Sequence, residues 1–285
     1  MVNVALVGCG HMGARHAAVI ASHPQCALVA AIDVRPERAA AIAAATGAEV
    51  SQAVPHGVDA VVVATPTTTH AQIAGPLLDQ GAWCLVEKPL AHSRPAAQSL
   101  DRARCIVGHI ERFNPALRAA GSLRPTVVEA RRVAPPTGRG GDVDVVLDLM
   151  IHDLDLVLGW MAPGAEVAWL DAVGVGPRID TASVRLRSTC GLTATLLASR
   201  AAGRQERRIE CFAPGRTVSL DLLLGTATVS GQTATPRDGR DALTAQWEAF
   251  VGKIKGEERG AVAGDTGVGA VALAEQIGTA IREQR

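Results

Sequence analysis

The chain has 285 residues, which is enough for about two domains with a core each. Its 28 basic residues balance its 28 acidic residues, so it lacks the strong positive field that nucleic acid or an anionic membrane requires of a partner. We therefore expect a small-molecule partner, no nucleic acid and no membrane.

Cysteine and tyrosine usage narrows the class further. The six cysteines form no CxxC pair, so we expect neither a metal site nor a dense disulfide framework. No basic and apolar leader precedes the strand-like start of the chain, and no apolar run approaches the ~18 residues of a membrane span. We therefore expect the cytoplasm. The absence of tyrosine excludes the short-chain dehydrogenases, which rely on a Tyr and Lys pair.

The first 110 residues alternate apolar runs with alanine-rich stretches, the pattern of βαβ units around a parallel sheet. Strands are expected at Val2–Cys9, Cys26–Asp33, Asp59–Thr65, Trp83–Lys88 and Cys105–Ile110. Helices are expected at Met12–Ser22, Pro36–Thr46, His70–Gln80 and Arg94–Ala103.

After Phe113 the regular alternation of strand-like and helical segments ends. A surface loop is expected at Pro135–Gly141, and one long amphipathic helix at Asp144–Met161. Several strand-like runs follow one another over Glu166–Val229, and they include a hairpin of Thr181–Arg187 with Leu192–Arg200. Helical periodicity returns from Arg240 onward, with a glycine-rich break at Gly260–Gly269.

The turn Gly8-Cys9-Gly10-His11-Met12-Gly13 follows the first expected strand and opens a helix. In this context GxGxxG indicates a dinucleotide site, because Gly8 permits the tight turn and Gly10 lets the pyrophosphate approach the backbone. Gly13 lets the helix pack on the sheet, and the free N–H groups of the helix start, at His11 and Met12, face the phosphates.

The fold class is therefore α/β. We expect a Rossmann dinucleotide-binding domain over residues 1–120 and a second α/β domain over residues 121–285, built on a mainly antiparallel open sheet. An alternative prediction is that the C-terminal helices pack back on the first domain.

Asp33 ends the second expected strand, 20 residues after Gly13. A carboxylate there accepts hydrogen bonds from the adenosine ribose hydroxyls and repels the 2′-phosphate of NADP. NAD is therefore the expected cofactor. Arg35 and Arg38 lie close by and could compensate a phosphate, so NADP stays open as an alternative.

Two further segments sit where parallel strands end, which is where ligands collect in such sheets. They are Thr65-Pro66 and Glu87-Lys88-Pro89. The ammonium group of Lys88 could bind a substrate hydroxyl and help to take its proton, and Pro89 could form a rigid or cis turn that aims it. A strand-end lysine taken alone is more often a surface charge.

The long helix carries Asp148, His152 and Asp155 at spacings of four and three residues, which places them on one face. A histidine beside a helical carboxylate suits a general base. A core histidine and a metal ligand are the competing interpretations, the metal being the weaker.

These elements together resemble the Gfo/Idh/MocA oxidoreductases, a family of sugar and cyclitol dehydrogenases. The residues that carry the resemblance are Gly8–Gly13, Asp33, Thr65-Pro66 with His70, Glu87-Lys88-Pro89, Arg112-Phe113, and Asp148, His152 and Asp155. The resemblance implies that Thr65, Pro66, His70 and Glu87 bind the cofactor. It also implies that the open sheet makes subunit contacts in a homo-oligomer, a dimer or tetramer.

The resemblance further implies that Lys88, Asp148 and His152 line the site where a secondary alcohol faces the nicotinamide. Within the family, residues 108–116 and 148–153 are similar to enzymes that act on the 3-position of UDP-N-acetylglucosamine. We expect hydride transfer from a sugar or nucleotide sugar to NAD, with His152 as base, Asp148 as its orienting group and Lys88 on the hydroxyl. Arg112, Asn114 and Asp155 are candidates for substrate contact, with a structural capping role equally open for Arg112 and Asn114.

Two alternatives remain at this point. One keeps the enzyme and changes its substrate to inositol, a free sugar, or an imine or amino-acid skeleton. The other is a non-catalytic NAD-binding regulatory protein that uses the fold without the chemistry.

Overall fold

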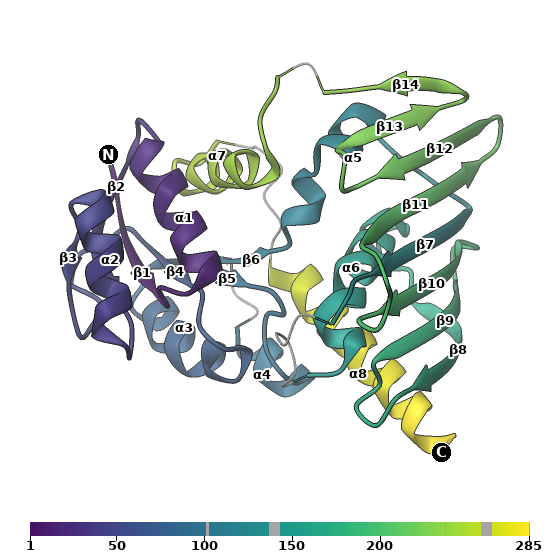
Figure 1. The fold of residues 1–285 in the computed structure, drawn as a ribbon, viewed down its shortest axis with the longest axis horizontal. Helices are drawn as coiled ribbons and strands as arrows, with labels where there is room; N and C mark the ends of the chain where they lie inside the picture. The colour runs from purple at the N-terminus through teal and green to yellow at the C-terminus, as the bar shows by residue number, and fades with distance from the viewer. Residues whose placement is uncertain (101–102, 137–142, 237, 258–263, 285) are drawn as a thin grey trace. The chain divides into compact units, whose positions relative to one another are not determined.

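We analysed a computed structural model of the chain (Figure 1). The structure describes all residues except 101–102, 137–142, 237, 258–263 and 285. The chain divides into two compact units. Unit 1 comprises Met1–Ile110 with Leu243–Val268, and unit 2 comprises Glu111–Ala242 with Gly269–Arg285. Each unit has its own apolar core.

Unit 1 is built on a six-stranded sheet in the order β3-β2-β1-β4-β5-β6, and every pair of neighbours is parallel. The strands are β1 (Val2–Val7), β2 (Cys26–Ile32), β3 (Glu49–Val50), β4 (Ala60–Val63), β5 (Trp83–Glu87) and β6 (Cys105–Gly108). β4 is buried along its whole length, as expected for a central strand covered on both faces. The order reverses at β1 and β4, and in such sheets the crevice at this point holds the ligand.

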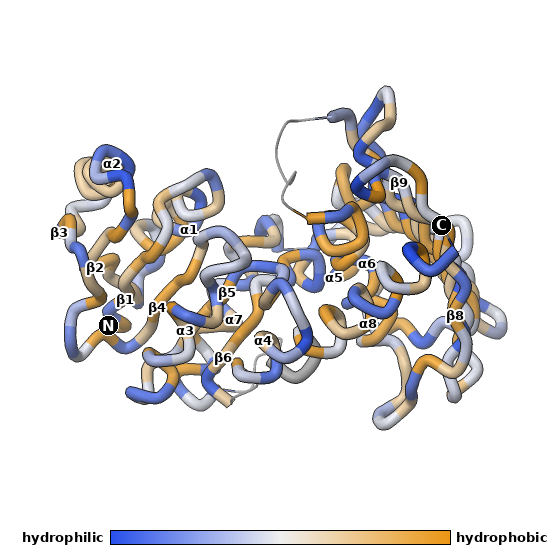
Figure 2. The backbone as a smooth tube through the Cα atoms, turned by 90° about the horizontal axis from the view of Figure 1, so that it is seen from below, coloured by the Kyte–Doolittle hydropathy of each residue, from blue (hydrophilic) through white to orange (hydrophobic). Residues whose placement is uncertain are grey.

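Helices alternate with these strands along the chain, as the periodicity predicts. They are α1 (His11–Ser22), α2 (Pro36–Thr46), η1 (Thr67–Thr69), α3 (His70–Asp79) and α4 (Arg94–Gln98). A later helix, α7 (Ala242–Ile254), adds Trp247 and Phe250 to the core of unit 1. The tube in Figure 2 shows the strands of this unit as its most apolar segments.

The sequence-based boundaries in unit 1 need small corrections. β1 ends at Val7 and not at Cys9, because Gly8 adopts a φ of 96° and begins the turn. The two-residue strand β3 escaped prediction because both its residues are exposed and it carries no apolar run. The helix expected to reach Ala103 ends at Gln98, and its residues 101–102 lie outside the described part.

Unit 2 is built on an eight-stranded sheet in the order β14-β13-β12-β11-β7-β10-β9-β8. Its strands are β7 (Val127–Val133), β8 (Val167–Val175), β9 (Thr181–Ser188), β10 (Thr193–Ser199), β11 (Glu206–Ala213), β12 (Arg216–Asp221), β13 (Thr226–Val229) and β14 (Gln232–Ala234). Only the central pair β7 and β10 is parallel among these neighbours. The mainly antiparallel sheet and the β9–β10 hairpin are therefore confirmed.

Helical segments cover one face of this sheet (Figure 1). They are η2 (Ile110–Phe113), α5 (Pro115–Ala120), a π-helical segment at Val146–Met150, α6 (Ile151–Trp160) and α8 (Gly264–Glu283). A single α-helix over Asp144–Met161 was wrong, because the first turns are π-helical. The glycine-rich break at Gly260–Gly269 was wrong from Gly264 onward, where α8 begins, and its earlier residues lie outside the described part. The loop expected at Pro135–Gly141 falls mostly on residues 137–142, which also lie outside it.

The other face of the sheet in unit 2 exposes apolar side chains. Val127 and Phe212 are cross-strand neighbours there, at 40% and 38% exposure, and Trp169 is exposed on β8. Within the described part of the chain, no helix combines the length and the apolar character needed to cross a membrane.

Candidate active site

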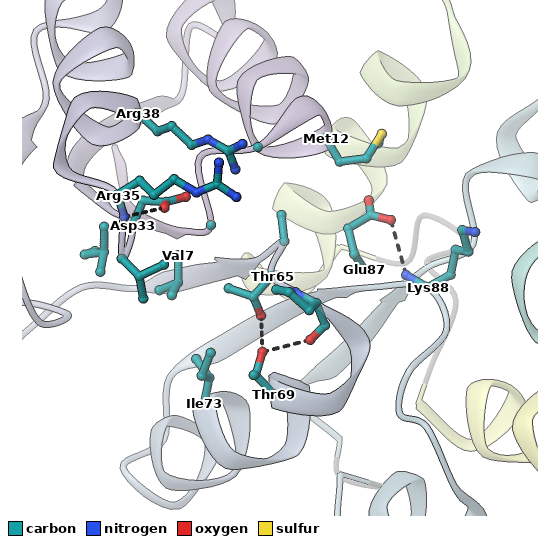
Figure 3. A pocket seen from close by; sticks show the side chains of 16 residues that line it. Val7, Met12, Asp33, Arg35, Arg38, Thr65, Thr69, Ile73, Glu87 and Lys88 are labelled. Carbon is teal, nitrogen blue, oxygen red and sulfur yellow. Dashed lines mark hydrogen bonds between the residues drawn. The ribbon is translucent and has the colours of Figure 1, made fainter. Parts of the chain in front are cut away.

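A pocket of about 580 Å³ opens in unit 1 at the carboxyl ends of β1, β2, β4 and β5. Figure 3 shows Arg35 and Arg38 beside Asp33 on one side of it, and Glu87 and Lys88 on the other. The predicted site residues that line it are Gly8, Gly10, Met12, Asp33, Arg35, Thr65, Pro66, Glu87 and Lys88. Nine predicted residues from four strand ends therefore share one pocket.

The glycine turn has the shape of a phosphate cradle. A Cβ on Gly8 would lie 2.5 Å from the carbonyl oxygen of Ala64, and one on Gly13 would lie 1.9 Å from that of Gly8. These two glycines are therefore required by the packing of turn, strand and helix. Gly10 differs, because its Cβ would enter open space with only the Arg38 guanidinium within 4 Å, at 3.9 Å. The pocket thus leaves room over Gly10 for a ligand to approach the backbone, as a pyrophosphate requires.

The Asp33 side chain is held at the rim of the pocket by backbone amides. Cys9 N–H donates to Oδ2 at 2.7 Å and Arg35 N–H donates to Oδ1 at 2.9 Å. A carboxylate has about four lone-pair sites, so two sites remain for ligand hydroxyls. Burial and the nearby Asp33 charge raise the pKa of the Cys9 thiol to about 11, so Cys9 stays a neutral packing group.

Glu87 ends β5 and Lys88 follows it, and both line the pocket. The Lys88–Pro89 peptide bond is cis, the form that the sequence left open. His70 does not line the pocket. It is buried at the start of α3, where Nδ1 lies 3.0 Å from the Pro89 oxygen and Nε2 lies 2.9 Å from the Thr65 oxygen. His70 therefore ties together the two strand-end segments that form the pocket wall. His11 is exposed at the first position of α1.

In unit 2, Asp148 lies in the π-helical segment and His152 lies at the start of α6, both half-buried. Asp155, one turn further on, is buried, and its carboxylate accepts two hydrogen bonds from the Arg112 guanidinium, Nε to Oδ2 at 2.6 Å and Nη2 to Oδ1 at 2.8 Å. Two predicted substrate contacts thus form a bidentate ion pair. A π-helical turn inside a helix is frequent at functional sites.

A buried cluster of charges, not foreseen from the sequence, lies next to these residues. Arg132 of β7 donates to Asp153 through Nε and Nη2, the closest contact being 2.8 Å, and through Nη1 to Glu111 at 2.8 Å. Burial alone would raise the pKa of Glu111, but Arg132, Arg207 and a hydrogen bond from Asn114 lower it. Glu111 is therefore a buried carboxylate. Asp153 follows His152 directly, so the cluster anchors the helix at the candidate base.

Asn114 has the capping role that the sequence left open. Its Oδ1 accepts from the Ala116 amide at the start of α5, and its Nδ2 donates to Glu111 and to the Leu222 oxygen. Among the described residues, no three His, Cys, Asp or Glu side chains gather to hold a metal ion.

Comparison with known proteins identifies the family. Residues 2–105 match the GFO_IDH_MocA model, described as an oxidoreductase family with an NAD-binding Rossmann fold. The UDP-N-acetylglucosamine 3-dehydrogenase of Acidithiobacillus ferrooxidans is 35% identical over 97% of this chain and 96% of its own length. The chain belongs to the Gfo/Idh/MocA oxidoreductase family. It is an NAD(P)-dependent dehydrogenase, and the regulatory alternative falls away.

A solved structure and a second relative support the comparison over the whole length. The solved structure of UDP-N-acetylglucosamine 3-dehydrogenase GnnA from Acidithiobacillus ferrooxidans superposes with a TM-score of 0.89 at 34% identity, covering 99% of this chain and 98% of that one. An inositol 2-dehydrogenase of Rhizobium meliloti is 28% identical over 100% of this chain and 98% of its own. The Gfo/Idh/MocA fold thus accounts for both units.

Two glycines of the turn give a matched test of the cradle in this family member. Gly13→Ala is expected to lower the free energy of unfolding by about 1–3 kcal/mol, because its methyl group meets the Gly8 carbonyl. Gly10→Ala is expected to keep the stability within about 0.5 kcal/mol and to weaken NADH binding, because its methyl group fills open space in the pocket. Denaturant unfolding and NADH fluorescence titration measure both. Normal NADH binding by Gly10→Ala would place the pyrophosphate elsewhere.

Proposed function

We propose that this dehydrogenase oxidises the 3-hydroxyl of UDP-N-acetylglucosamine, or of a closely related nucleotide sugar, with NAD as hydride acceptor. The observation that carries the proposal is a likeness over the full length, in both units, to an enzyme of that name. Unit 2 carries the helix with His152 and the Arg112–Asp155 pair, so a likeness confined to the nucleotide-binding unit would not support a substrate.

The residues of the pocket fit a dinucleotide. The Gly8–Gly13 turn with the start of α1 would hold the pyrophosphate, and Asp33 would accept hydrogen bonds from the adenosine ribose. When bound, the nicotinamide supplies the hydride acceptor. Asp33 favours NAD over NADP by charge, while Arg35 and Arg38 on the same rim support weaker use of NADP.

We assign the proton chemistry to three side chains. Lys88 holds the substrate oxygen through its ammonium group and stabilises the negative charge that develops there. His152 accepts the hydroxyl proton, and Asp148 orients its imidazole. The C–H bond then breaks with its electron pair as hydride, and the O–H electrons form the carbonyl.

The Arg112–Asp155 ion pair supports distinct roles for the two residues, which the sequence analysis treated alike as substrate contacts. Asp155 fixes the guanidinium in one plane, which is the arrangement that recognises phosphate or a carbonyl oxygen. We propose Arg112 as the substrate contact and Asp155 as the group that positions it. Asn114, whose amide is used by the α5 cap and by Glu111, supports the same segment.

An activity screen tests the substrate and the cofactor together. The purified chain is incubated with NAD or NADP and with UDP-N-acetylglucosamine, UDP-glucose or myo-inositol, and reduced nicotinamide is followed by absorbance. The proposal expects turnover of UDP-N-acetylglucosamine with NAD, and less with NADP. Turnover of inositol alone would contradict it and would favour the second candidate, an inositol dehydrogenase like that of Rhizobium meliloti.

We also propose that the protein is a homo-oligomer, a dimer or tetramer, through the open sheet face of unit 2. The exposed Val127, Phe212 and Trp169 on that face support a contact between copies. The cytoplasm stays the proposed compartment, since six cysteines held as free thiols are typical of a reducing environment.

A further inference from the structure

Three polar side chains form a buried chain within unit 1. The Trp247 indole N–H donates to His16 Nδ1 at 2.9 Å, and His16 Nε2 lies 2.8 Å from Glu87 Oε1. Trp247 and His16 are fully buried, and Glu87 is 8% exposed where it lines the pocket. The residues come from α7, α1 and the end of β5, so a C-terminal helix reaches the carboxylate beside Lys88 through one histidine.

The donors and acceptors available to these three side chains determine which nitrogen of His16 carries the proton. An indole nitrogen only donates, so His16 Nδ1 must offer a lone pair to Trp247. The ring then carries its single proton on Nε2 and donates it to Glu87. Edge-on ring contacts of Trp247 with His16 and with Phe250 keep the indole in this orientation.

Glu87 is thereby held as a pocket-facing carboxylate. Its Oε2 accepts the Lys88 amide N–H at 3.2 Å, and a Cβ at Gly108 would lie only 3.0 Å from Oε1, so a glycine on β6 makes room for the side chain. Burial by itself would raise the pKa of Glu87, but the hydrogen bond from His16 and the nearby Lys88 lower it. About two lone-pair sites of the carboxylate remain for a ligand.

We propose that His16 and Trp247 are positioning residues of the dinucleotide site, which hold the Glu87 carboxylate in the orientation that receives a hydrogen bond from the bound cofactor. The inference rests on the proposed function, and it adds Glu87, which lines the same pocket, to the cofactor contacts proposed there. It assigns a role in the site to α7, a helix distant in sequence from every dinucleotide motif.

The tautomer is tested without any activity. The full-length protein is labelled with ¹⁵N-histidine, and the His16 signals are identified among its eight histidines by their loss in His16→Gln. We expect His16 in the Nε2–H form in the wild type, and a change of tautomer or protonation state in Trp247→Phe, which keeps an aromatic ring and removes the N–H donor. An Nδ1–H or doubly protonated His16 in the wild type would overturn the proposal.

The role in the site is tested by NADH binding. His16→Leu removes the donor to Glu87 and is expected to raise the Kd for NADH about tenfold, the usual worth of a hydrogen bond to a charged group. His16→Gln keeps an N–H at the same reach and is expected to restore most of the affinity. Equal weakening in both variants, at matched unfolding free energies, would show a packing role only and would contradict the proposal. NADH binding can be measured even if none of the tested substrates is turned over. The binding test can therefore contradict this proposal independently of the proposed function.

Discussion

The Lys88→Met variant is expected to lose about 10²- to 10³-fold in kcat, the range for removing one group that stabilises charge developing on a substrate oxygen. Methionine keeps the length of the side chain and removes the ammonium, so the pocket should keep its shape. The substrate oxygen would then lose the positive group that holds it and stabilises its developing charge. NADH affinity is expected to change little, because the proposed cofactor contacts are mainly the glycine turn and Asp33, on the other side of the pocket. Steady-state kinetics and NADH fluorescence titration measure the two effects separately.

Lys253→Met is the matched control for this change. Lys253 is exposed on α7 in the same unit, so its loss removes an equal charge away from the pocket and should leave kcat unchanged. Near-normal turnover by Lys88→Met would remove Lys88 from the mechanism. An equal loss in both variants would mean that the effect is one of net charge.

The Arg132→Met variant is expected to lose about 3–5 kcal/mol of unfolding free energy, because it removes the guanidinium that both buried acidic side chains bind. Glu111 would keep only Arg207, at 3.4 Å, and Asn114. Glu111 and Asp153 each have less than 6% of the side chain exposed, and both bind the Arg132 guanidinium. The change should also disturb His152, which is adjacent to Asp153. Denaturant unfolding with extrapolation to water measures the loss.

Arg131→Met is the control on the same strand. Its side chain is 49% exposed and its Nε lies 3.3 Å from Glu206, so its loss should cost about 0–1 kcal/mol.

The pH dependence of the difference in stability between wild type and Arg132→Met gives a second check. Because the folded-state pKa of Glu111 is lowered, its contribution is present above the ordinary value of 4.5 and is lost as the pH falls through the folded pKa. The gap between wild type and Arg132→Met should therefore narrow in acid, and a constant gap would contradict the ion-pair account.

The nucleotide-binding unit could be predicted closely because its signals are local. The Gly8–Gly13 turn, the carboxylate 20 residues later and the apolar strands each specify their neighbours directly, and the structure places them around one pocket. Unit 2 was harder. β7 escaped prediction because its inward positions include Arg132, whose charge breaks the apolar alternation and is neutralised only by residues elsewhere in the chain.

The contacts of the site were less accessible than its motifs. Placing Asp148, His152 and Asp155 on one face from their spacing requires a regular α-helix. The local sequence pattern does not indicate the π-helical turn at Val146–Met150. The Trp247–His16 hydrogen bond joins residues 231 positions apart, which no motif can signal. The local signal for this contact is that His16 falls on the same face of α1 as Gly13 and Ile20, which pack against the sheet.

The central claim is that Lys88 and His152 act on the same substrate hydroxyl. A double-variant cycle tests it most directly, with kcat measured for Lys88→Met, His152→Ala and the variant with both changes. If the two groups serve one proton transfer, the double variant should be about as slow as the slower single variant, as for residues that act as a unit. Losses that multiply, so that two single losses of about 10³ become about 10⁶, would mean that the residues act independently and would contradict the account.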